Sequence, residues 1–207
     1  MISPASDSVG IPATRGPGPI APAQAVQQAA PRRLNLGCGT DIRPGWVNLD
    51  CARLPGVDVV HDLSCLPLPF EAGQFSSICA KDVLEHLDYI PLLKELHRIL
   101  QVGGTLEIQV PHFTSASNYI DPTHKRQFSI RTFEFFVASS EFGRGYYFDF
   151  QFAQLAGRRL TFLGGPLIWN KLVGPLVNLH PKIQQYYELT FLSRLFPAEN
   201  IVVQLIK

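Results

Sequence analysis

The chain has 207 residues, enough for one domain with a substantial core, and 46% of them are hydrophobic while 17% are charged. These fractions are typical of a globular, soluble protein and exclude a chain that is disordered throughout. The 18 basic and 17 acidic residues leave a net charge of +1, which disfavours a nucleic-acid partner, because a polyanion is bound by an excess of lysine and arginine. The expected partner is a small or carrier-linked molecule.

The N-terminal part of the chain differs from the rest in composition. Residues 1–31 are rich in Ala, Pro, Gly and Ser, and no charged segment precedes an apolar one, so we expect no secretory signal. We interpret them as a flexible extension with a short helix possible at 23–30, and residues 32–207 as the folded domain. The cysteines form no C-x-x-C pair, which indicates reduced thiols in a cytosolic protein; they are Cys38, Cys51, Cys65 and Cys79.

From position 33 onward, short apolar segments alternate with turns. They predict strands at residues 33–38, 47–50, 57–60, 75–80, 105–110, 159–163 and 201–206. Leucines and isoleucines at helical spacing predict a helix over 83–100, with a break or new start near Pro91 and an end at Gly103 and Gly104. The pattern indicates an α/β fold, a Rossmann-like doubly wound sandwich on a mostly parallel seven-stranded sheet with an antiparallel closing strand.

Residues 113–187 are expected to form an insertion that covers the acceptor side of the fold as a lid. Its aromatic residues between 128 and 152 are predicted to pack in the core or the lid more readily than to stack on a sugar. The apolar stretch 160–179 is interrupted by glycine, proline and Lys171, which disfavours a transmembrane segment. Peripheral contact of residues 167–177 with a membrane surface is left open as an alternative.

Three strand ends carry residues suited to bind a nucleoside. The glycine-rich turn Gly37-Cys-Gly39 follows the first predicted strand and lets a ligand approach the backbone. Asp50 ends the second strand, where a carboxylate can accept both hydroxyls of a ribose, and Asp62 follows the third, where it can accept from an adenine amino group. Ile42 stands where a dinucleotide fingerprint needs a third glycine. An adenosine attached to an amino acid therefore fits better than a pyrophosphate.

The order of these motifs resembles the class I S-adenosylmethionine-dependent methyltransferases over residues 32–110. The resemblance lies in Leu36-Gly-Cys-Gly39, Asn48-Leu-Asp50, His61-Asp-Leu63, Asp82-Val-Leu-Glu-His-Leu87 and residues 100–104. The segment Gly45-Trp-Val-Asn-Leu-Asp50, which follows a shortened first helix, resembles that of a bacterial subgroup of this family often associated with glycan and polysaccharide biosynthesis. The resemblance implies S-adenosylmethionine as cofactor, with its methionine part beside Gly37, Cys38, Gly39, Lys81 and Asp82, its ribose at Asp50 and its adenine at Asp62 and Leu63.

Methyl transfer needs an acceptor held in line with the methyl carbon and a group that takes its proton. His124 is the predicted general base, because imidazole titrates near neutral pH, and Asp121 is predicted to orient it. His86 is a further catalytic candidate, and His112 is a second candidate for the base. Lys125, Arg126 and Arg131 are interpreted as a solvated face, with contact to the phosphate of a nucleotide- or lipid-linked acceptor as the alternative.

A divalent metal is a second interpretation of the same region. Asp82, Glu85 and His86 share one face if a helix starts there, and His124 would be a fourth ligand. This spacing is similar to that of small-RNA 2′-O-methyltransferases and ubiquinone-pathway O-methyltransferases, except that Asp82 replaces their usual glutamate. A structural role for Glu85 and His86 is favoured over metal use, which stays open.

The expected function is methyl transfer to a hydroxyl of a sugar or other small biosynthetic intermediate. Two alternatives remain at this stage. One is a natural-product O- or N-methyltransferase, and the other is a non-catalytic protein that binds S-adenosylmethionine. The Asp121 and His124 pair argues against the second, whereas the fold class alone says little about the acceptor.

Overall fold

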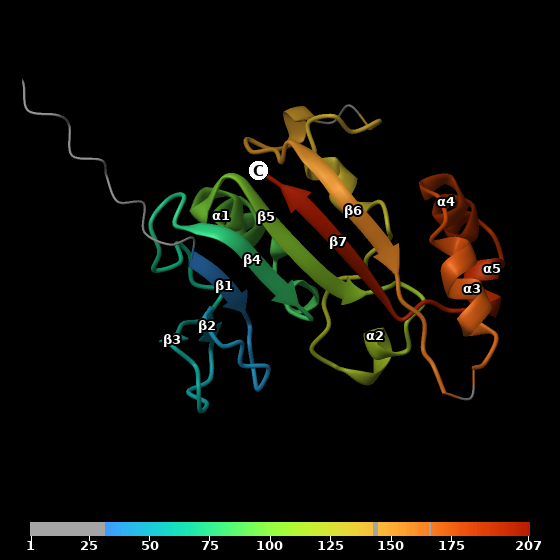
Figure 1. Cartoon of the computed structure of the whole chain (residues 1–207), viewed down its shortest axis with the longest axis horizontal. Helices are drawn as coiled ribbons and strands as arrows, with labels where there is room; N and C mark the ends of the chain where they lie inside the picture. The colour runs from blue at the N-terminus through green and yellow to red at the C-terminus, as the bar shows by residue number, and fades with distance from the viewer. Residues whose placement is uncertain (1–31, 143–144, 166) are drawn as a thin grey trace, which may run out of the picture.

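A computed structural model describes residues 32–142, 145–165 and 167–207, so the extension expected at residues 1–31 lies outside the described part. Within these described residues, seven strands form one sheet in the order β3-β2-β1-β4-β5-β7-β6 (Figure 1). Strands β1 to β5 pair in parallel, and β7 runs antiparallel to both β5 and β6. The predicted mostly parallel seven-stranded sheet with its antiparallel closing strand is confirmed. The strands are β1 Arg32–Leu36, β2 Val47–Asp50, β3 Val59–Val60, β4 Phe75–Lys81, β5 Leu100–Pro111, β6 Gln154–Leu160 and β7 Asn200–Ile206.

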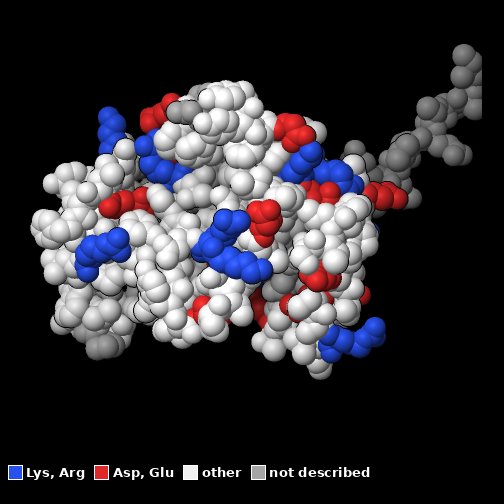
Figure 2. Space-filling view, turned by 180° about the vertical axis from the view of Figure 1, so that it is seen from behind, with Lys and Arg blue, Asp and Glu red and all other residues white. Residues whose placement is uncertain are grey.

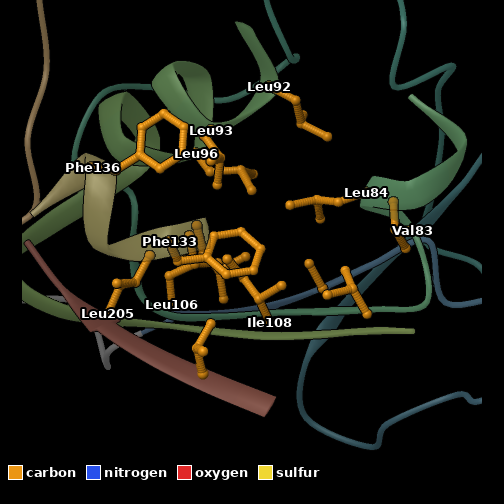
Figure 3. Packing of buried hydrophobic residues seen from close by; sticks show 14 of the residues in the cluster. Val83, Leu84, Leu92, Leu93, Leu96, Leu106, Ile108, Phe133, Phe136 and Leu205 are labelled. Atoms are coloured by element: carbon orange, nitrogen blue, oxygen red, sulfur yellow. The ribbon is translucent and has the colours of Figure 1, made fainter. Parts of the chain in front are cut away.

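Apolar and polar side chains alternate along the strands, and the apolar ones form the core. In β5, Leu106, Ile108 and Val110 are fully buried, whereas Glu107 between them is exposed, because successive side chains of a strand point to opposite faces. The buried face packs against α1 (Tyr89–Ile99) and the 3-10 turn η2 (Thr132–Phe136) (Figure 3). Leu92, Leu93 and Leu96 line the inner side of α1.

The predicted helix over 83–100 is two elements, η1 (Leu84–His86) and α1. The break falls at Leu87 and Asp88, whose backbones are extended, and Pro91 lies in the first turn of α1, where a missing N–H costs no hydrogen bond. The helix ends at Ile99, before the glycine pair, because Leu100 already pairs with Phe75 in the sheet.

The segment 113–187 does not lie wholly outside the sheet. It contains β6, which pairs with β7 from Gln154 to Leu160 and therefore lies earlier than the strand predicted at 159–163. Its aromatic part packs in the core, as predicted, with Phe128, Phe133, Phe136 and Phe152 buried. The remaining helices are α2 (Ser117–Ile120), η3 (Gly145–Tyr147), α3 (Asn170–Val177), α4 (Pro181–Leu189) and α5 (Leu192–Leu195).

Helices α3 to α5 stand together beyond the β6 side of the sheet (Figure 1). No helix in the described part of the chain combines the length and the apolar character that crossing a membrane requires. Connections β1–β2, β2–β3 and β3–β4 are loops without a helix. Because β1 to β4 pair in parallel, their carboxyl ends lie along one edge of the sheet.

Candidate functional site

The turn after β1 depends on two glycines with positive φ, +61° at Gly37 and +49° at Gly39. A Cβ at Gly37 would lie 2.4 Å from Cγ2 of Val83, so this position is closed by the protein itself. A Cβ at Gly39 would meet no protein atom within 4 Å. The turn therefore packs on its Gly37 side and is open on its Gly39 side, which leaves room for a ligand against the backbone.

Asp50 ends β2 beside this turn. Its Oδ2 accepts a hydrogen bond of 2.7 Å from the backbone N–H of Gly39, and its Oδ1 accepts one of 2.9 Å from Ala52. Burial alone would raise the pKa of the Asp50 carboxyl, but these N–H groups hold its pKa below the ordinary value. The structure thus joins the first two strand ends through an ionised carboxylate.

The residues that follow β3 lie at the same edge of the sheet as Gly39 and Asp50. The backbone N–H of His61 donates to the carbonyl of Asp50 at 2.9 Å. Asp62 is exposed, and hydrogen bonds from the backbone and hydroxyl of Ser64 lower the pKa of its carboxyl, while Leu63 is buried. The structure therefore brings the first six residues predicted to hold the cofactor to the carboxyl ends of β1 to β3.

Lys81 and Asp82 complete the set of cofactor candidates at the end of β4. Asp82 has a φ of +54°, unusual for a residue with a side chain. Its backbone N–H donates to the carbonyl of Gln109 at 2.9 Å, and the amide of Gln109 donates to its carboxylate. These contacts hold the bend that leads from β4 into η1.

A pocket of about 450 Å³ opens beside Asp82. It lies between η1, the start of α2 and the loop that follows α2. Its polar lining includes Glu85, His86, Ser115, Asp121 and His124. All three residues predicted to be catalytic, His86, Asp121 and His124, therefore line one cavity next to the last two cofactor candidates.

Two hydrogen bonds and one longer carboxylate–imidazole contact link the two imidazoles of this pocket. Nδ1 of His86 lies 2.8 Å from the hydroxyl of Thr123, and that hydroxyl lies 2.6 Å from Oδ1 of Asp121. Oδ2 of Asp121 is 3.7 Å from Nε2 of His124. Because hydrogen bonds from the hydroxyl and backbone of Thr123 hold the pKa of Asp121 below its ordinary value, the carboxylate is an acceptor. The Thr123 hydroxyl then donates to Asp121 and accepts from His86.

Glu85 is the most unusual group in the pocket. Its side chain is 1% exposed, and both carboxylate oxygens lack a hydrogen-bond partner among the described residues. Burial raises the pKa of the Glu85 carboxyl to about 7. Its backbone carbonyl accepts from the N–H groups of Lys125 and Arg126 at 2.7 and 3.2 Å, which fixes the His124 loop against η1.

His112 occupies a different place from the one expected of a base. It is fully buried, with Nδ1 2.6 Å from the hydroxyl of Thr114 and Nε2 3.0 Å from Oε1 of Glu188. Its neighbours Pro111 and Ser115 line the pocket, whereas its own ring faces the core. The prediction of His112 as a second base is wrong, since both ring nitrogens are committed to structural contacts.

Two of the three basic residues considered for a phosphate contact are ion-paired. Arg131 lies 2.8 Å from Glu134, and Arg126 lies 3.5 Å from Asp88. Sequence reasoning missed Thr123, although the pattern Asp121-Pro-Thr123 is typical of an aspartate that caps the backbone two residues later. It also missed Glu188, for which no local signal exists.

Comparison with known proteins adds three findings. A family model described as a methyltransferase domain matches residues 16–108. No curated relative matches the sequence at a significant level. Among solved structures, the chain is similar to a SAM-dependent methyltransferase from Archaeoglobus fulgidus, with 17% identity, 86% of each chain covered and a TM-score of 0.53.

Two further structures share the fold at similar distance. The YcgJ protein from Bacillus subtilis is 15% identical over 85% of this chain and 91% of its own, with a TM-score of 0.51. The geranyl diphosphate C-methyltransferase from Streptomyces coelicolor is 11% identical over 86% of this chain and 72% of its own, with a TM-score of 0.52. At these identities the likeness shows the fold.

Proposed function

This chain carries an S-adenosylmethionine-dependent methyltransferase domain, and from that premise we propose that it methylates a hydroxyl of a sugar or of another small biosynthetic intermediate, free or carrier-linked. The observation that carries the proposal is the pocket beside Asp82, in which two imidazoles lie near the Asp121 carboxylate. Such groups suit an acceptor that must lose a proton.

The glycine turn and the strand ends fit the methyl donor. The open side of Gly39 admits a ligand to the backbone, and the ionised Asp50 retains acceptor capacity for ribose hydroxyls beyond its two backbone hydrogen bonds. We assign the adenine to Asp62 and Leu63, and the methionine part to Gly37, Cys38, Gly39, Lys81 and Asp82. When bound, S-adenosylmethionine supplies a methyl group on a positively charged sulfur.

His124 takes the proton of the acceptor hydroxyl in this proposal. As the oxygen bonds to the methyl carbon, the carbon–sulfur bond breaks and the hydroxyl proton passes to the imidazole. Oδ2 of Asp121, 3.7 Å from Nε2 of His124, stabilises the imidazolium that forms. Glu85 holds the His124 loop in position through its backbone carbonyl.

The test separates cofactor binding from turnover. Methyl transfer from labelled S-adenosylmethionine is measured with nucleotide sugars, lipid-linked glycans and hydroxylated small molecules as acceptors. We expect His124→Gln to keep its affinity for S-adenosylhomocysteine in calorimetry and to lose about 10²- to 10⁴-fold in rate. His180→Asn, at an exposed histidine that caps α4, is the matched control and should keep both. A His124→Gln protein with undiminished turnover contradicts the assigned base.

The cofactor site has its own test. Asp50→Ala should lower the affinity for S-adenosylhomocysteine by about 10- to 100-fold, because a hydrogen bond to a charged group contributes roughly 1.5–3 kcal/mol. Glu71→Gln, at an exposed carboxylate away from the strand ends, controls for the change of charge. Unchanged affinity in a folded Asp50→Ala protein would remove the ribose assignment.

A further inference from the structure

We infer that Glu85, His86 and His124 form a binding site for a first-row transition-metal dication of the Zn²⁺ type. One ligand atom from each residue lies within 4.8 Å of the others. Around an ion with bonds of about 2.1 Å, ligand atoms lie roughly 3–4 Å apart, so small side-chain rotations close the site. Asp82, which the sequence pattern had added to the set, does not belong to this group of three.

The buried carboxylate of Glu85 is an independent observation that points to a cation. A carboxylate that is 1% exposed and whose two oxygens have no partner among the described residues is costly to bury. Nδ1 of His124 is also buried, and it has no hydrogen-bond partner within the described part of the chain. A dication coordinated by Glu85 and His124 would give each of these two buried groups a partner.

The hydrogen-bond chain prepares His86 as a ligand. Because the Thr123 hydroxyl donates to Asp121, it accepts from Nδ1 of His86, and a neutral His86 then carries its lone pair on Nε2. A metal-binding histidine commonly donates its other ring N–H to an oxygen that fixes its tautomer. Thr123 and Asp121 provide that support here.

Two imidazoles and one carboxylate favour a transition metal over Mg²⁺, which prefers oxygen ligands. Three protein ligands leave a coordination position for the acceptor hydroxyl, as in catalytic zinc sites. The role of the ion rests on the proposed function: a bound ion would polarise the acceptor hydroxyl, whose proton would pass to the Asp121 carboxylate and on to solvent. The base role assigned above to His124 would then apply to the metal-free chain only, while the bonds made and broken at the methyl carbon would stay the same.

Metal binding can be measured without any acceptor. The purified, metal-stripped chain is titrated with Zn²⁺ by calorimetry and with Co²⁺ by visible absorption, and Mg²⁺ is titrated in parallel. We expect one ion per chain, Co²⁺ bands of a four- or five-coordinate site, and no comparable binding of Mg²⁺. A wild-type chain that binds neither Zn²⁺ nor Co²⁺ overturns the site, whatever its methyltransferase activity.

Variants identify the ligands. Glu85→Gln and His86→Gln should each weaken Zn²⁺ binding by about tenfold or more, and Thr123→Val should weaken it by about 10- to 100-fold through loss of support for His86. His180→Asn should bind Zn²⁺ like wild type. Affinity for S-adenosylhomocysteine, measured in each variant, reports an intact fold. Zn²⁺ binding that survives both Glu85→Gln and His86→Gln places the ion elsewhere and overturns the inference.

A different observation carries a second proposal, that helices α3 to α5 dock on an anionic lipid surface. Large apolar side chains cover the outside of this three-helix segment, and they include Trp169, Leu172, Leu176, Leu179, Leu189 and Phe191. Leu172 and Phe191 are 71% and 72% exposed. The surface over these helices is mainly uncharged (Figure 2, left), and apolar areas of this kind mark interaction sites.

The exposed charges of the segment indicate an anionic partner. Within residues 167–196 the exposed charged side chains are Lys171, Lys182 and Arg194, all basic. The single acidic residue, Glu188, is turned inward, where it accepts hydrogen bonds from Ser129 and Ile130. Apolar side chains framed by basic ones match a bilayer that carries acidic headgroups. Leu163, shortly before the segment, lines the acceptor pocket, so docking would bring that pocket toward the lipid.

Vesicle flotation tests the docking. The chain should float with phosphatidylcholine vesicles that contain phosphatidylglycerol, more weakly with phosphatidylcholine alone, and less as salt rises. The double variant Leu172→Ser, Phe191→Ser should bind about tenfold less, and Val102→Ser, at an exposed apolar residue of β5, should bind like wild type. The proposal is overturned by absence of flotation, or by a dimer in light scattering that the double variant abolishes, since a second copy would then cover the surface.

Discussion

At the scale of single residues, Glu188 connects three parts of the fold. Its Oε1 accepts from the backbone N–H of Ile130 at 2.7 Å and lies 3.0 Å from His112, while its Oε2 accepts from Ser129 at 2.6 Å. Burial alone would raise the pKa of the Glu188 carboxyl, but these hydrogen bonds hold its pKa below the ordinary value. A lowered pKa in the folded state stabilises the protein above the unfolded pKa, about 4.3, and this stabilisation is lost as the pH falls through the folded value.

Glu188→Gln should therefore lower the free energy of unfolding by about 1–3 kcal/mol at pH 7, because Gln places an N–H₂ group among donors. The difference from wild type should shrink as the pH falls below the unfolded pKa and through the lower folded one, where the wild-type carboxyl becomes protonated. Urea denaturation of both proteins at pH 7 and at acidic pH measures this. A difference that stays constant with pH would show that charge plays no part.

The site residues that can be predicted from the sequence are those with a local pattern around them. Gly37, Asp50 and Asp62 each follow a short apolar strand, and parallel strands bring their carboxyl ends to one edge, so their convergence follows from the pattern. The pairing of His112 with Glu188 spans 76 residues. Neither residue indicates the other in the sequence, so the sequence alone leaves His112 as a second candidate for the base behind His124.

At the scale of elements, the two glycines of the turn after β1 differ in their surroundings: the Cβ position of Gly37 is closed by Val83, and that of Gly39 is open. A side chain at either position is strained by about 1–2 kcal/mol because of the positive φ. Gly37→Ala also meets Cγ2 of Val83, so it should destabilise the fold more than Gly39→Ala, as measured by urea denaturation. Gly39→Ala should instead lose most of its affinity for S-adenosylhomocysteine.

A double-variant comparison checks the cause. Gly37→Ala combined with Val83→Ala should cost less stability than the sum of the single changes, because the colliding methyl group is gone. Strict additivity would mean that φ strain alone acts at Gly37. Full S-adenosylhomocysteine binding by Gly39→Ala would place the ligand away from this turn.

Element boundaries were predictable where hydrophobic pattern and sheet pairing agree. β2 has the predicted bounds, Val47–Asp50. β5 begins five residues earlier than predicted, at Leu100, because its first residue pairs with Phe75 although Gly103 and Gly104 follow. Glycine normally interrupts a strand. That β5 continues through Gly103 and Gly104 is visible only from its pairing with the neighbouring strand β4.

At the scale of the whole molecule, helix packing and the aromatic segment concentrate on one face of the sheet. On the opposite face Glu107 of β5 and Gln204 of β7 lie in register and are both exposed. This polar face follows from the alternation of β5, because successive side chains of a strand point to opposite faces. The segments that cover the other face come from positions far apart in the sequence. The convergence of the strand ends at one edge, by contrast, follows from the parallel strand order.

A ligand at that edge joins β1, β2 and β3 with β4 and should stabilise the whole domain. A ligand that binds only the folded chain at 100 times its dissociation constant adds about 2.7 kcal/mol. For a chain of this size that raises the melting temperature by about 5–10 °C. We expect such a shift with S-adenosylhomocysteine, and none with adenine alone at the same concentration, because adenine lacks the ribose for Asp50 and the amino-acid part for the glycine turn. Asp50→Ala should lose most of the shift, whereas Glu71→Gln should keep it. Equal shifts in both variants would mean that the ligand binds away from the carboxyl ends of these strands.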